Sequence, residues 1–434
     1  MSAISTTILS LSIPQEYSHY GRITEDDTIT RLNTWKITTE NSLTRLKDLV
    51  AREEHLQLSL QNKANLVSTV AAFTGPGSWV SERSHNLAIS VLEPFSSPDL
   101  HLLEYILKDH IRPIFQSNPH PHLNESTGRK LPRAAGGPMA SQDYYEGQTW
   151  KSYPGIFNVA SWCVRHTQGD VYERLWHLII PPVMALVDDY EAEYKLRGVM
   201  LVQDMLKRVP VALLRRTGVD GLLLTSLMGT LNHLRHPETP NLLRTAIPTI
   251  LSLVNLTTSP DSQQRFNQLC ALLGDAIVGS VWIYAYTDLD AVEASVDALP
   301  GVIKALGIGS TRYLKALVPQ LVHPLIPTPH ASPCISLQLS SLRALGVVIE
   351  VCAVRMFIWK YTILDGVGKC WVSLLDSGVD DDASRELKKA LCDICDKLAQ
   401  ACPSVVKEEY TQMVSLHSSL FKGLFQIPKR AVVP

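Results

Sequence analysis

The chain has 434 residues, of which 45% are hydrophobic and 19% charged, so it has enough apolar content for a continuous core and too little charge for wholesale disorder. Forty Lys and Arg residues against 42 Asp and Glu give a formal net charge of -2, which provides no overall field for gathering nucleic acid or anionic lipid. The eight scattered cysteines, the lack of a basic leader and the lack of an apolar run of about 18 residues predict a soluble, reduced protein of the cytoplasm and nucleus, without direct contact with nucleic acid or membrane.

Nearly every long segment shows the periodicity of a helix, and almost none alternates as a strand would. In chain order, the predicted helices cover 38–63, 79–92, 98–115, 151–165, 171–187, 191–209, 219–235, 239–256, 262–277, 287–305, 310–322, 334–354, 381–401 and 403–421. Residues 1–35 are expected to form a partly ordered N-terminal tail, and residues 426–434 a C-terminal tail.

One segment, residues 116–148, breaks the helical pattern because it is rich in Pro, Gly, Ser and Asn. A connection longer than about 15 residues without structure of its own is usually functional or disordered. The sequence therefore predicts a flexible segment that separates an N-terminal helical region, 36–115, from a longer C-terminal region, 149–425.

The C-terminal region contains a faint internal repeat. Ile180-Pro181 and Ile247-Pro248 are each followed at the same spacing by Leu-Val, and a weaker copy begins at Val318-Pro319. A helix with proline, an aspartate at the corner and a basic residue on the next helix resemble the HEAT-repeat pattern, with Pro181, Asp189 and Lys195 in those places. The copies are too far apart for a regular array, so we expect an all-α fold: an irregular HEAT-like α-solenoid of antiparallel helix pairs with one long flexible internal loop.

The paired acids Asp188 and Asp189 have two interpretations. They could bind a metal or act as an acid/base couple, which would require further ligands from elsewhere and burial. They could instead cap the helix 191–209, because Asp is favoured where a helix begins. We favour the cap.

The other candidate motifs are also better explained by structure. Cys392, Cys395 and Cys402 lack the second ligand pair of a zinc finger and are expected to be core residues of a helix. The stretches 365–370 and 307–310 lack the full phosphate-binding pattern and are expected to be turns. The sequence therefore predicts neither an enzyme nor a cofactor or metal site.

Residues 119–208 together resemble a known family, that of the second interacting protein of the telomere-length-regulation protein, a subunit of the Triple-T (TTT) complex. The order and spacing of several short motifs carry this resemblance. They are His120-Pro121, Leu131-Pro132-Arg133, Trp150-Lys151, Trp162, Asp188-Asp189-Tyr190, Lys195 and Gly198.

The resemblance implies a non-enzymatic helical-repeat adaptor. Its partners would be the large HEAT-repeat subunit and the telomere-length-regulation subunit of the TTT complex. Through them it would serve the ninety-kilodalton heat-shock chaperone in the maturation of phosphatidylinositol-3-kinase-related kinases. The motif residues are the candidates for partner binding.

Three alternatives stay open at this point. Trp150 and Arg133 are residue types common at interface hot spots, but Trp150 could equally anchor the segment in the core. The chain could be another HEAT-like adaptor, such as a transport factor. Less expected is a metal-dependent hydrolase that uses Asp188 and Asp189.

Overall fold

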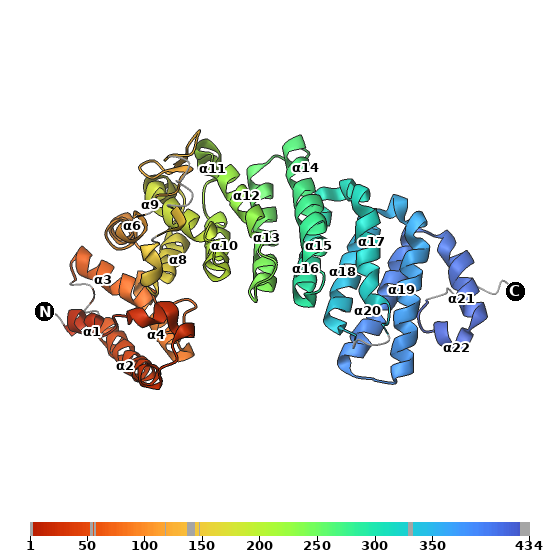
Figure 1. The fold of residues 1–434 in the computed structure, drawn as a ribbon, viewed down its shortest axis with the longest axis horizontal. Coiled ribbons are helices and arrows are strands. Elements are labelled where there is room, and N and C mark those ends of the chain that lie inside the picture. The colour runs from red at the N-terminus through yellow and green to blue at the C-terminus, as the bar shows by residue number, and fades with distance from the viewer. Residues whose placement is uncertain are drawn as a thin grey trace. The chain divides into compact units, whose positions relative to one another are not determined.

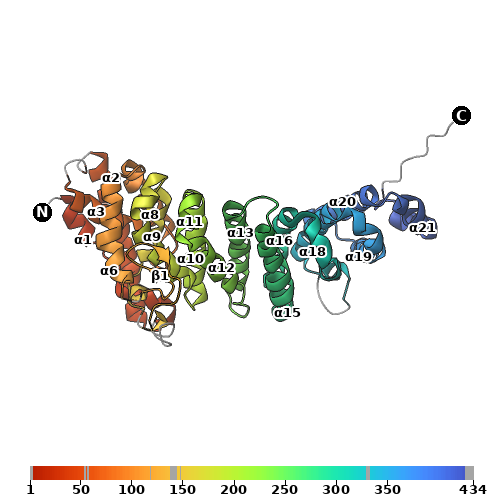
Figure 2. The ribbon, with the colours of Figure 1, turned by 90° about the horizontal axis from the view of Figure 1, so that it is seen from above.

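The structure is a computed structural model that describes residues 3–52, 55, 58–117, 119–136, 144–146, 148–328 and 333–425. Its residues form two compact units, 1–226 and 227–434. Helices dominate both units, as Figures 1 and 2 show, and the all-α, solenoid-like fold predicted from the sequence is confirmed. The sequence analysis instead placed a boundary at segment 116–148, and that division stays a prediction.

The elements of the first unit are, in order, α1 (Ala3–Leu9), η1 (Gln15–Arg22), α2 (Asp26–Ala51), α3 (Leu60–Ala71), α4 (Glu82–Leu92), η3 (Glu93–Phe95), α5 (Leu100–Tyr105), η4 (Ile106–Ile111), α6 (Arg112–Phe115), β1 (Leu123–Asn124), β2 (Arg129–Lys130), η5 (Thr149–Ser152), α8 (Ile156–His166), α9 (Asp170–Val187), α10 (Ala192–Leu206) and α11 (Val211–Thr217). The elements labelled η are 3-10 or π-helical turns. Helix α12 (Val219–Thr230) contains the boundary between the units.

The elements of the second unit are α13 (Thr239–Thr257), α14 (Gln263–Cys270), η6 (Ala271–Val281), α15 (Trp282–Tyr284), α16 (Leu289–Leu306), η7 (Gly307–Tyr313), α17 (Leu314–Val322), η8 (His323–Leu325), α18 (Ile335–Val351), η9 (Ala353–Arg355), α19 (Met356–Ser377), α20 (Asp382–Ala401), η10 (Val406–Tyr410), α21 (Thr411–Leu416) and α22 (Ser418–Phe421).

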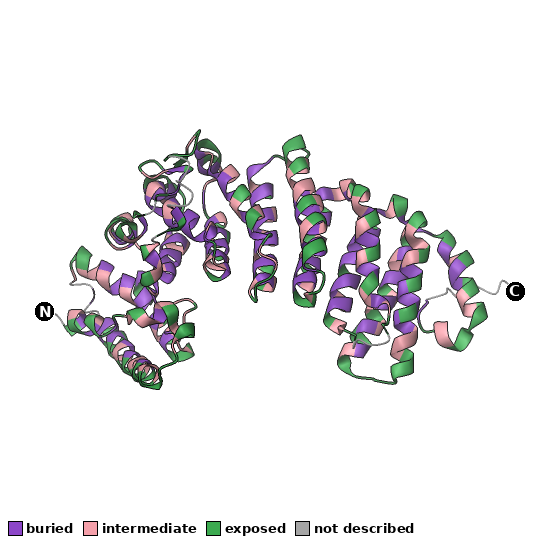
Figure 3. Ribbon diagram, in the orientation of Figure 1, coloured by how far each residue is buried: buried purple, intermediate pink, exposed green. Residues whose placement is uncertain are grey.

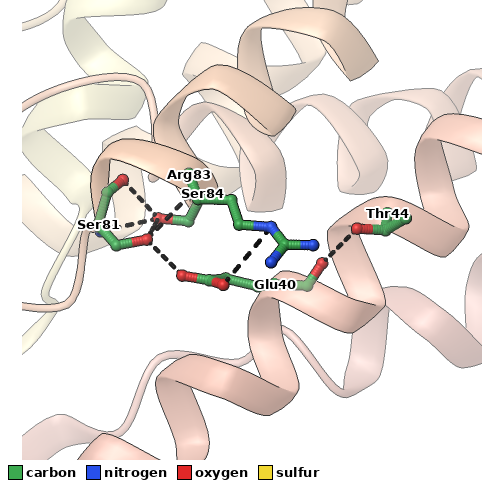
Figure 4. Close-up of polar contacts among 5 residues, drawn as sticks. All are labelled: Glu40, Thr44, Ser81, Arg83 and Ser84. Atoms are coloured by element: carbon green, nitrogen blue, oxygen red, sulfur yellow. Dashed lines mark hydrogen bonds and ion pairs between the residues drawn. The ribbon is translucent and has the colours of Figure 1, made fainter.

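Helices α2 and α4 show how capping and packing combine at the start of the chain. Ser81 accepts a hydrogen bond from the Ser84 N–H, and the Ser84 hydroxyl accepts one from the Ser81 N–H, which is a capping box for α4. The Ser81 hydroxyl also donates to Glu40 of α2 over 2.7 Å, and Arg83 lies 3.7 Å from the same carboxylate (Figure 4). The cap of α4 is therefore also its polar link to α2.

The pair α9–α10 is antiparallel, as the predicted architecture requires. Lys195, near the start of α10, donates to the Val187 carbonyl at the end of α9. At the start of α9, burial raises the pKa of Tyr172, and the negative charge of Asp204, near the end of α10, adds to this rise, so these two residues lie close together. The three prolines of the faint repeat, Pro181, Pro248 and Pro319, all lie inside helices, in α9, α13 and α17.

In the second unit α13, α16, α18 and α20 contact one another in succession. Helices α16 and α18 run parallel, because Ser336 bonds Glu293 and, further along both helices, Arg343 bonds Asp297. Buried positions, purple in Figure 3, recur along these helices. Such parallel stacking of successive elements is typical of a solenoid.

The stretch Gln263–Tyr284, which joins α14, η6 and α15, has a mean hydropathy of 1.4 over its most apolar window, and 39% of that window is buried. By length and composition alone it could cross a membrane, but core helices of soluble proteins meet the same criterion. It contacts α16, and Trp282 donates to the buried Ser295 hydroxyl over 2.9 Å, so we assign it to the helical core.

Helix α19 was not predicted. The sequence analysis assigned the glycines of 365–370 to a turn, and this is wrong, because Gly366 and Gly368 lie inside a 22-residue helix. A Cβ at Gly366 would lie 2.3 Å from the Val322 side chain, so the glycine is used for close packing on α17 and not for a bend.

Two other predicted helices differ from the structure. The predicted helix 38–63 is two helices, α2 and α3, because Ser59 accepts a hydrogen bond from the Asn62 N–H and starts α3 as its N-cap. The predicted helix 403–421 is divided into η10, α21 and α22, with a break at His417.

The described part of segment 116–148 has a short structure of its own. Leu123–Asn124 pairs antiparallel with Arg129–Lys130, and Leu123 is buried. Trp176 of α9 donates to the Gly128 carbonyl over 2.8 Å, which fixes this hairpin on the helix. The sequence gives no strand alternation here, since each strand has only two residues. The remainder of the expected flexible segment, 118, 137–143 and 147, lies outside the described residues.

Candidate functional site

The corner between α9 and α10 brings together most of the motif residues, and it begins with a close approach of two helices. A Cβ built at Gly198 would lie 2.3 Å from the Val187 nitrogen and 2.5 Å from the Leu186 carbonyl carbon. No side chain fits between these backbones, so only glycine allows α10 to cross the end of α9 at this distance.

Lys195, one turn before Gly198, reaches back to the same helix end. Its Nζ donates to the Val187 carbonyl over 2.9 Å, and the residue is buried. The last carbonyls of a helix lack partners within it and carry partial negative charge, so a buried ammonium suits this position. Burial lowers the pKa of Lys195, although Asp188 and Asp189 act in the opposite direction.

Asp189 lies fully buried at the centre of the corner. Its Oδ1 accepts the Glu191 N–H over 2.8 Å and lies 3.0 Å from the Lys151 Nζ, which also bonds Glu191 over 2.8 Å. Burial raises the pKa of Asp189, against the opposing effects of the Glu191 N–H and Lys151. Burial also raises the pKa of Glu191, but the bond from Lys151 outweighs it, so that pKa is lowered overall. Lys151 therefore holds two carboxylates in a place with little water.

Three aromatic rings surround the same ammonium group. The Lys151 Nζ lies 4.1 Å from the centre of the Tyr190 ring, 4.9 Å from that of Tyr194 and 5.4 Å from that of Trp150. At these distances a cation is attracted to the ring faces. Lys151 thus ties η5, the corner and α10 together through charge and through cation–π contacts.

His120 joins the described part of segment 116–148 to the corner. Its Nε2 lies 2.8 Å from Asp188 Oδ2, and its Nδ1 accepts the His122 N–H. Because Nδ1 accepts, the ring proton is on Nε2 and is donated to Asp188. The buried Tyr144 ring stands edge-on to His120 at 5.1 Å.

Trp150 is 3% exposed and packs between two rings, stacked on Phe115 at 5.6 Å and edge-on to Tyr194 at 5.0 Å. This is the position that the anchor interpretation of Trp150 requires. Its effect on partner binding stays a prediction.

The other motif residues have different settings. Trp162 is a buried residue of α8, stacked on His166 of its own helix at 4.3 Å. The Leu131 N–H donates to the His122 carbonyl over 2.9 Å, just beyond the hairpin, while Pro132 and Arg133 are exposed. Tyr190 is exposed at the corner. The structure brings His120, Trp150, Lys151, the corner acids and Lys195 into one cluster and leaves Trp162 and Leu131–Arg133 outside it.

The capping hypothesis for Asp188 and Asp189 is wrong in its details. The N-cap of α10 is Glu191, without a side-chain cap bond, and Asp188 is the C-cap of α9. Asp189 accepts the N–H two residues on, which is the bond of an Asx turn ahead of the helix. The acids therefore shape the corner itself.

Sequence reasoning missed Phe115, Tyr144 and Tyr194 as members of the cluster. Tyr194 lies in the first turns of the predicted helix 191–209, close behind the acidic corner, which is the one signal that could have indicated it. Nothing local indicates the other two, which meet the corner only in the folded chain.

The bonds that the corner acids already make bear on a metal site, because Asp188 bonds His120 and Asp189 bonds Lys151. In the part of the chain that the structure describes, no group of three or more His, Cys, Asp and Glu side chains could hold a metal ion. Of the three cysteines predicted as core residues of a helix, Cys395 is buried inside α20, Cys402 is buried just beyond its end, and Cys392 is half-buried. Burial raises the pKa of all three thiols.

A polar groove of about 560 Å³ lies beside the cluster. It is lined by residues of η1, by the stretch 150–157 of η5 and the turn after it, by Glu191, the N-cap of α10, and by three residues of α10, namely Glu193, Tyr194 and Arg197, with Ser78 and Trp79. The corner thus combines a core of paired polar groups with an accessible rim, an arrangement that fixes the geometry of this surface.

Comparison with known proteins gives a family match. The model of the Tti2 family matches residues 66–333, well over half of the chain and all of the corner. TELO2-interacting protein 2 of Mus musculus is 31% identical over 91 residues, which are 21% of this chain and 17% of that protein. TELO2-interacting protein 2 of Rattus norvegicus is 25% identical over 172 residues, 39% of this chain and 33% of that protein. The chain thus matches a third or less of the length of these curated relatives.

Among solved structures, an engineered protein aligns over 98% of this chain and 97% of its own, with 14% identity and a TM-score of 0.35. A TM-score this low has no bearing on fold or function.

Proposed function

We propose, since the chain belongs to the Tti2 family, that it is a non-catalytic adaptor subunit of the TTT complex. The family match over 66–333 carries this proposal. It is supported by the names of the two relatives, which describe proteins that interact with TELO2.

The corner supports the adaptor role through its chemistry. Its charged groups are bonded within the corner, Lys151 to Asp189 and Glu191, and Lys195 to the end of α9, so they hold α9, α10, η5 and the His120 segment in one arrangement. A site with fixed geometry and an exposed Tyr190 presents a surface to another protein.

The finer proposal concerns partners and clients. The chain would bind the large HEAT-repeat subunit and the telomere-length-regulation subunit, in the cytoplasm and nucleus. Through them it would support the ninety-kilodalton heat-shock chaperone and the maturation of phosphatidylinositol-3-kinase-related kinases. No direct contact with nucleic acid or membrane is part of this proposal.

Affinity purification of the tagged chain from its own cells at moderate salt, followed by mass spectrometry, tests the proposal. We expect near-stoichiometric recovery of one very large HEAT-repeat protein and of the telomere-length-regulation protein. Recovery of the chain alone would contradict the proposal.

The same purification tests the corner as a binding surface. Tyr190→Ala removes an exposed ring, and Tyr286→Ala, at a similarly exposed tyrosine of the second unit, is the matched control. If the corner contacts a partner, Tyr190→Ala lowers recovery of that partner and Tyr286→Ala does not. Equal recovery with both variants would restrict the corner to a structural role.

A further inference from the structure

Helix α19 has an apolar stripe that nothing covers in the described part of the chain. Val354 before the helix is 69% exposed, and Phe357, Ile358 and Tyr361 in its first turns are 57%, 53% and 65% exposed. Their spacing of three or four residues places them on one side of the helix. The neighbouring Lys360 borders the stripe, because it pairs with Glu408 and Glu409 and its Nζ lies 5.0 Å from the centre of the Tyr361 ring.

The same side of α19 continues into a groove. Leu364, Gly368 and Val372 follow Tyr361 at helical spacing and line an apolar-walled cavity of about 770 Å³. Its other walls are Ile326 and Pro327 after η8, and Met413 and Phe421 of α21 and α22. Gly368 adds no side chain to this wall, and a Cβ there would be in ordinary contact with the Met413 side chain, at 3.5 Å.

Together the stripe and the groove run the length of α19. Its 22 residues correspond to about 33 Å at the usual rise of a helix. Figure 3 shows exposed and intermediate positions along this helix. A long, narrow apolar face of this kind fits another helix that lies along it, with side chains at intervals of three and four residues as anchors.

Charge distinguishes the two ends of this face. Asp365 and Asp376 line the groove, and Lys369 offsets only Asp365, with which it pairs over 2.7 Å. The carbonyl end of α19 lies beside Asp376 and adds negative potential. The other end carries the exposed Arg355. The occupant should therefore present a basic residue over Asp376 and an apolar stripe over Phe357, Ile358 and Tyr361.

We propose that this face of α19 is the docking site for an amphipathic helix with a basic end, contributed by a companion subunit. The inference rests on the proposed function, because it assumes that the chain works in a complex. It adds a location and a recognition chemistry to that function.

Substitution of the stripe tests the site in the assembled complex. Phe357→Glu places a charge in the middle of the apolar contact, and Ile283→Glu, at an isoleucine of α15 that is 55% exposed, is the matched control. Because both positions face solvent, both variants should keep the native melting temperature. We expect recovery of the companion subunit to fall about tenfold or more with Phe357→Glu and to be unchanged with Ile283→Glu.

A charge reversal tests the polarity of the site. Asp376→Lys should reduce recovery severalfold, and the loss should shrink at high salt because exposed charges are screened. Unchanged recovery with both Phe357→Glu and Asp376→Lys would overturn the docking site. In that case the adaptor function would still stand, provided that the native chain recovers its subunits.

Photo-crosslinking identifies the occupant directly. With benzoylphenylalanine in place of Tyr361, mass spectrometry of the crosslinked complex should find an amphipathic helical segment of a companion subunit with Lys or Arg at one end. A crosslink to a second copy of this chain, or no crosslink in an assembled complex, would overturn the proposal. Failure of the native chain to recover any subunit would overturn this site and the proposed function together.

Discussion

At position 198 the lack of a side chain sets the distance between two helices. The Cβ of an alanine there would overlap the backbone of Val187 and Leu186, which cannot move aside as a flexible side chain could. Lys195 depends on the same crossing, since its bond to the Val187 carbonyl needs α10 to lie close to the end of α9.

We therefore expect Gly198→Ala to destabilise the protein by about 3 kcal/mol, at the upper end of the usual cost of overpacking. Urea denaturation followed by circular dichroism measures this change. Gly229→Ala is the control, because a Cβ at Gly229 of α12 meets nothing within 4 Å and alanine favours a helix. Equal stability of both variants would show that the helices separate at little cost.

The burial of Asp189 predicts a dependence on pH. Burial raises its pKa above the ordinary value of 3.8, so the folded chain binds this proton more tightly than the unfolded chain does. The contribution of Asp189 to stability is therefore fully present below its unfolded pKa and is lost as the pH rises through the folded pKa.

Asp189→Asn removes this titration and keeps an oxygen for the Glu191 N–H. The difference in unfolding free energy, variant minus native, should thus increase between about pH 4 and about pH 7. Melting temperatures of the two proteins at both pH values measure it. A constant difference, or one that decreases, would mean that Lys151 fully offsets the burial of the carboxylate.

At the scale of elements, His120 is the tie between the hairpin of segment 116–148 and the corner. His120→Ala removes the bond to the Asp188 carboxylate, a type worth about 1.5–3 kcal/mol. We expect trypsin to cleave severalfold faster at Arg129, Lys130 or Arg133, while the main helical transition changes little.

His122→Ala is the matched control for that experiment. The side chain of His122 is exposed, and its bond to His120 uses the backbone N–H, which alanine keeps. Equal cleavage rates for the two variants would show that the bond of Trp176 to Gly128 holds the hairpin without His120.

Local sequence signals predicted some elements and not others. The predicted helix 171–187 agrees with α9, which covers 170–187. Its apolar stripe indicates a helix, and the acids of the corner indicate where that helix ends. Helix α19 was missed, because the glycines that pack it against α17 have the same local signature as a turn.

The site was predictable as a set of residues but not as a set of contacts. The corner at Asp188–Tyr190 follows from the pattern on either side of it. The pairs Lys151–Asp189 and His120–Asp188, however, join residues far apart in the sequence, and no local spacing reports them. The exposed apolar face of α19 could not be predicted either, because the sequence does not show whether an apolar residue of a helix is covered by another element or exposed.

At the scale of the whole molecule, stability should differ along the chain. Eleven of the 17 residues of α18, which contacts α16 and α20, are buried, whereas α21 and α22 contain no buried residue. In a stack where each element contacts mainly its neighbours, the terminal elements open first.

Hydrogen exchange with mass spectrometry should thus show amides of 411–421 exchanging about tenfold or more faster than those of 335–351. Binding of a helix along α19 would slow exchange in α21 and α22, which form one wall of the groove. Equally slow exchange in both regions of the free protein would indicate a single cooperative unit.

The enclosure of Lys151 has a consequence for the chemistry of the chain's amines. Acylation requires an amine that a reagent or an enzyme can approach, and the Lys151 amine bonds two carboxylates and lies behind three rings. Lys195 is shielded by its burial inside the crossing of α9 and α10. Acetylation or ubiquitination of the folded protein would therefore spare these two lysines, and a modified Lys151 would mark a molecule whose corner had already opened.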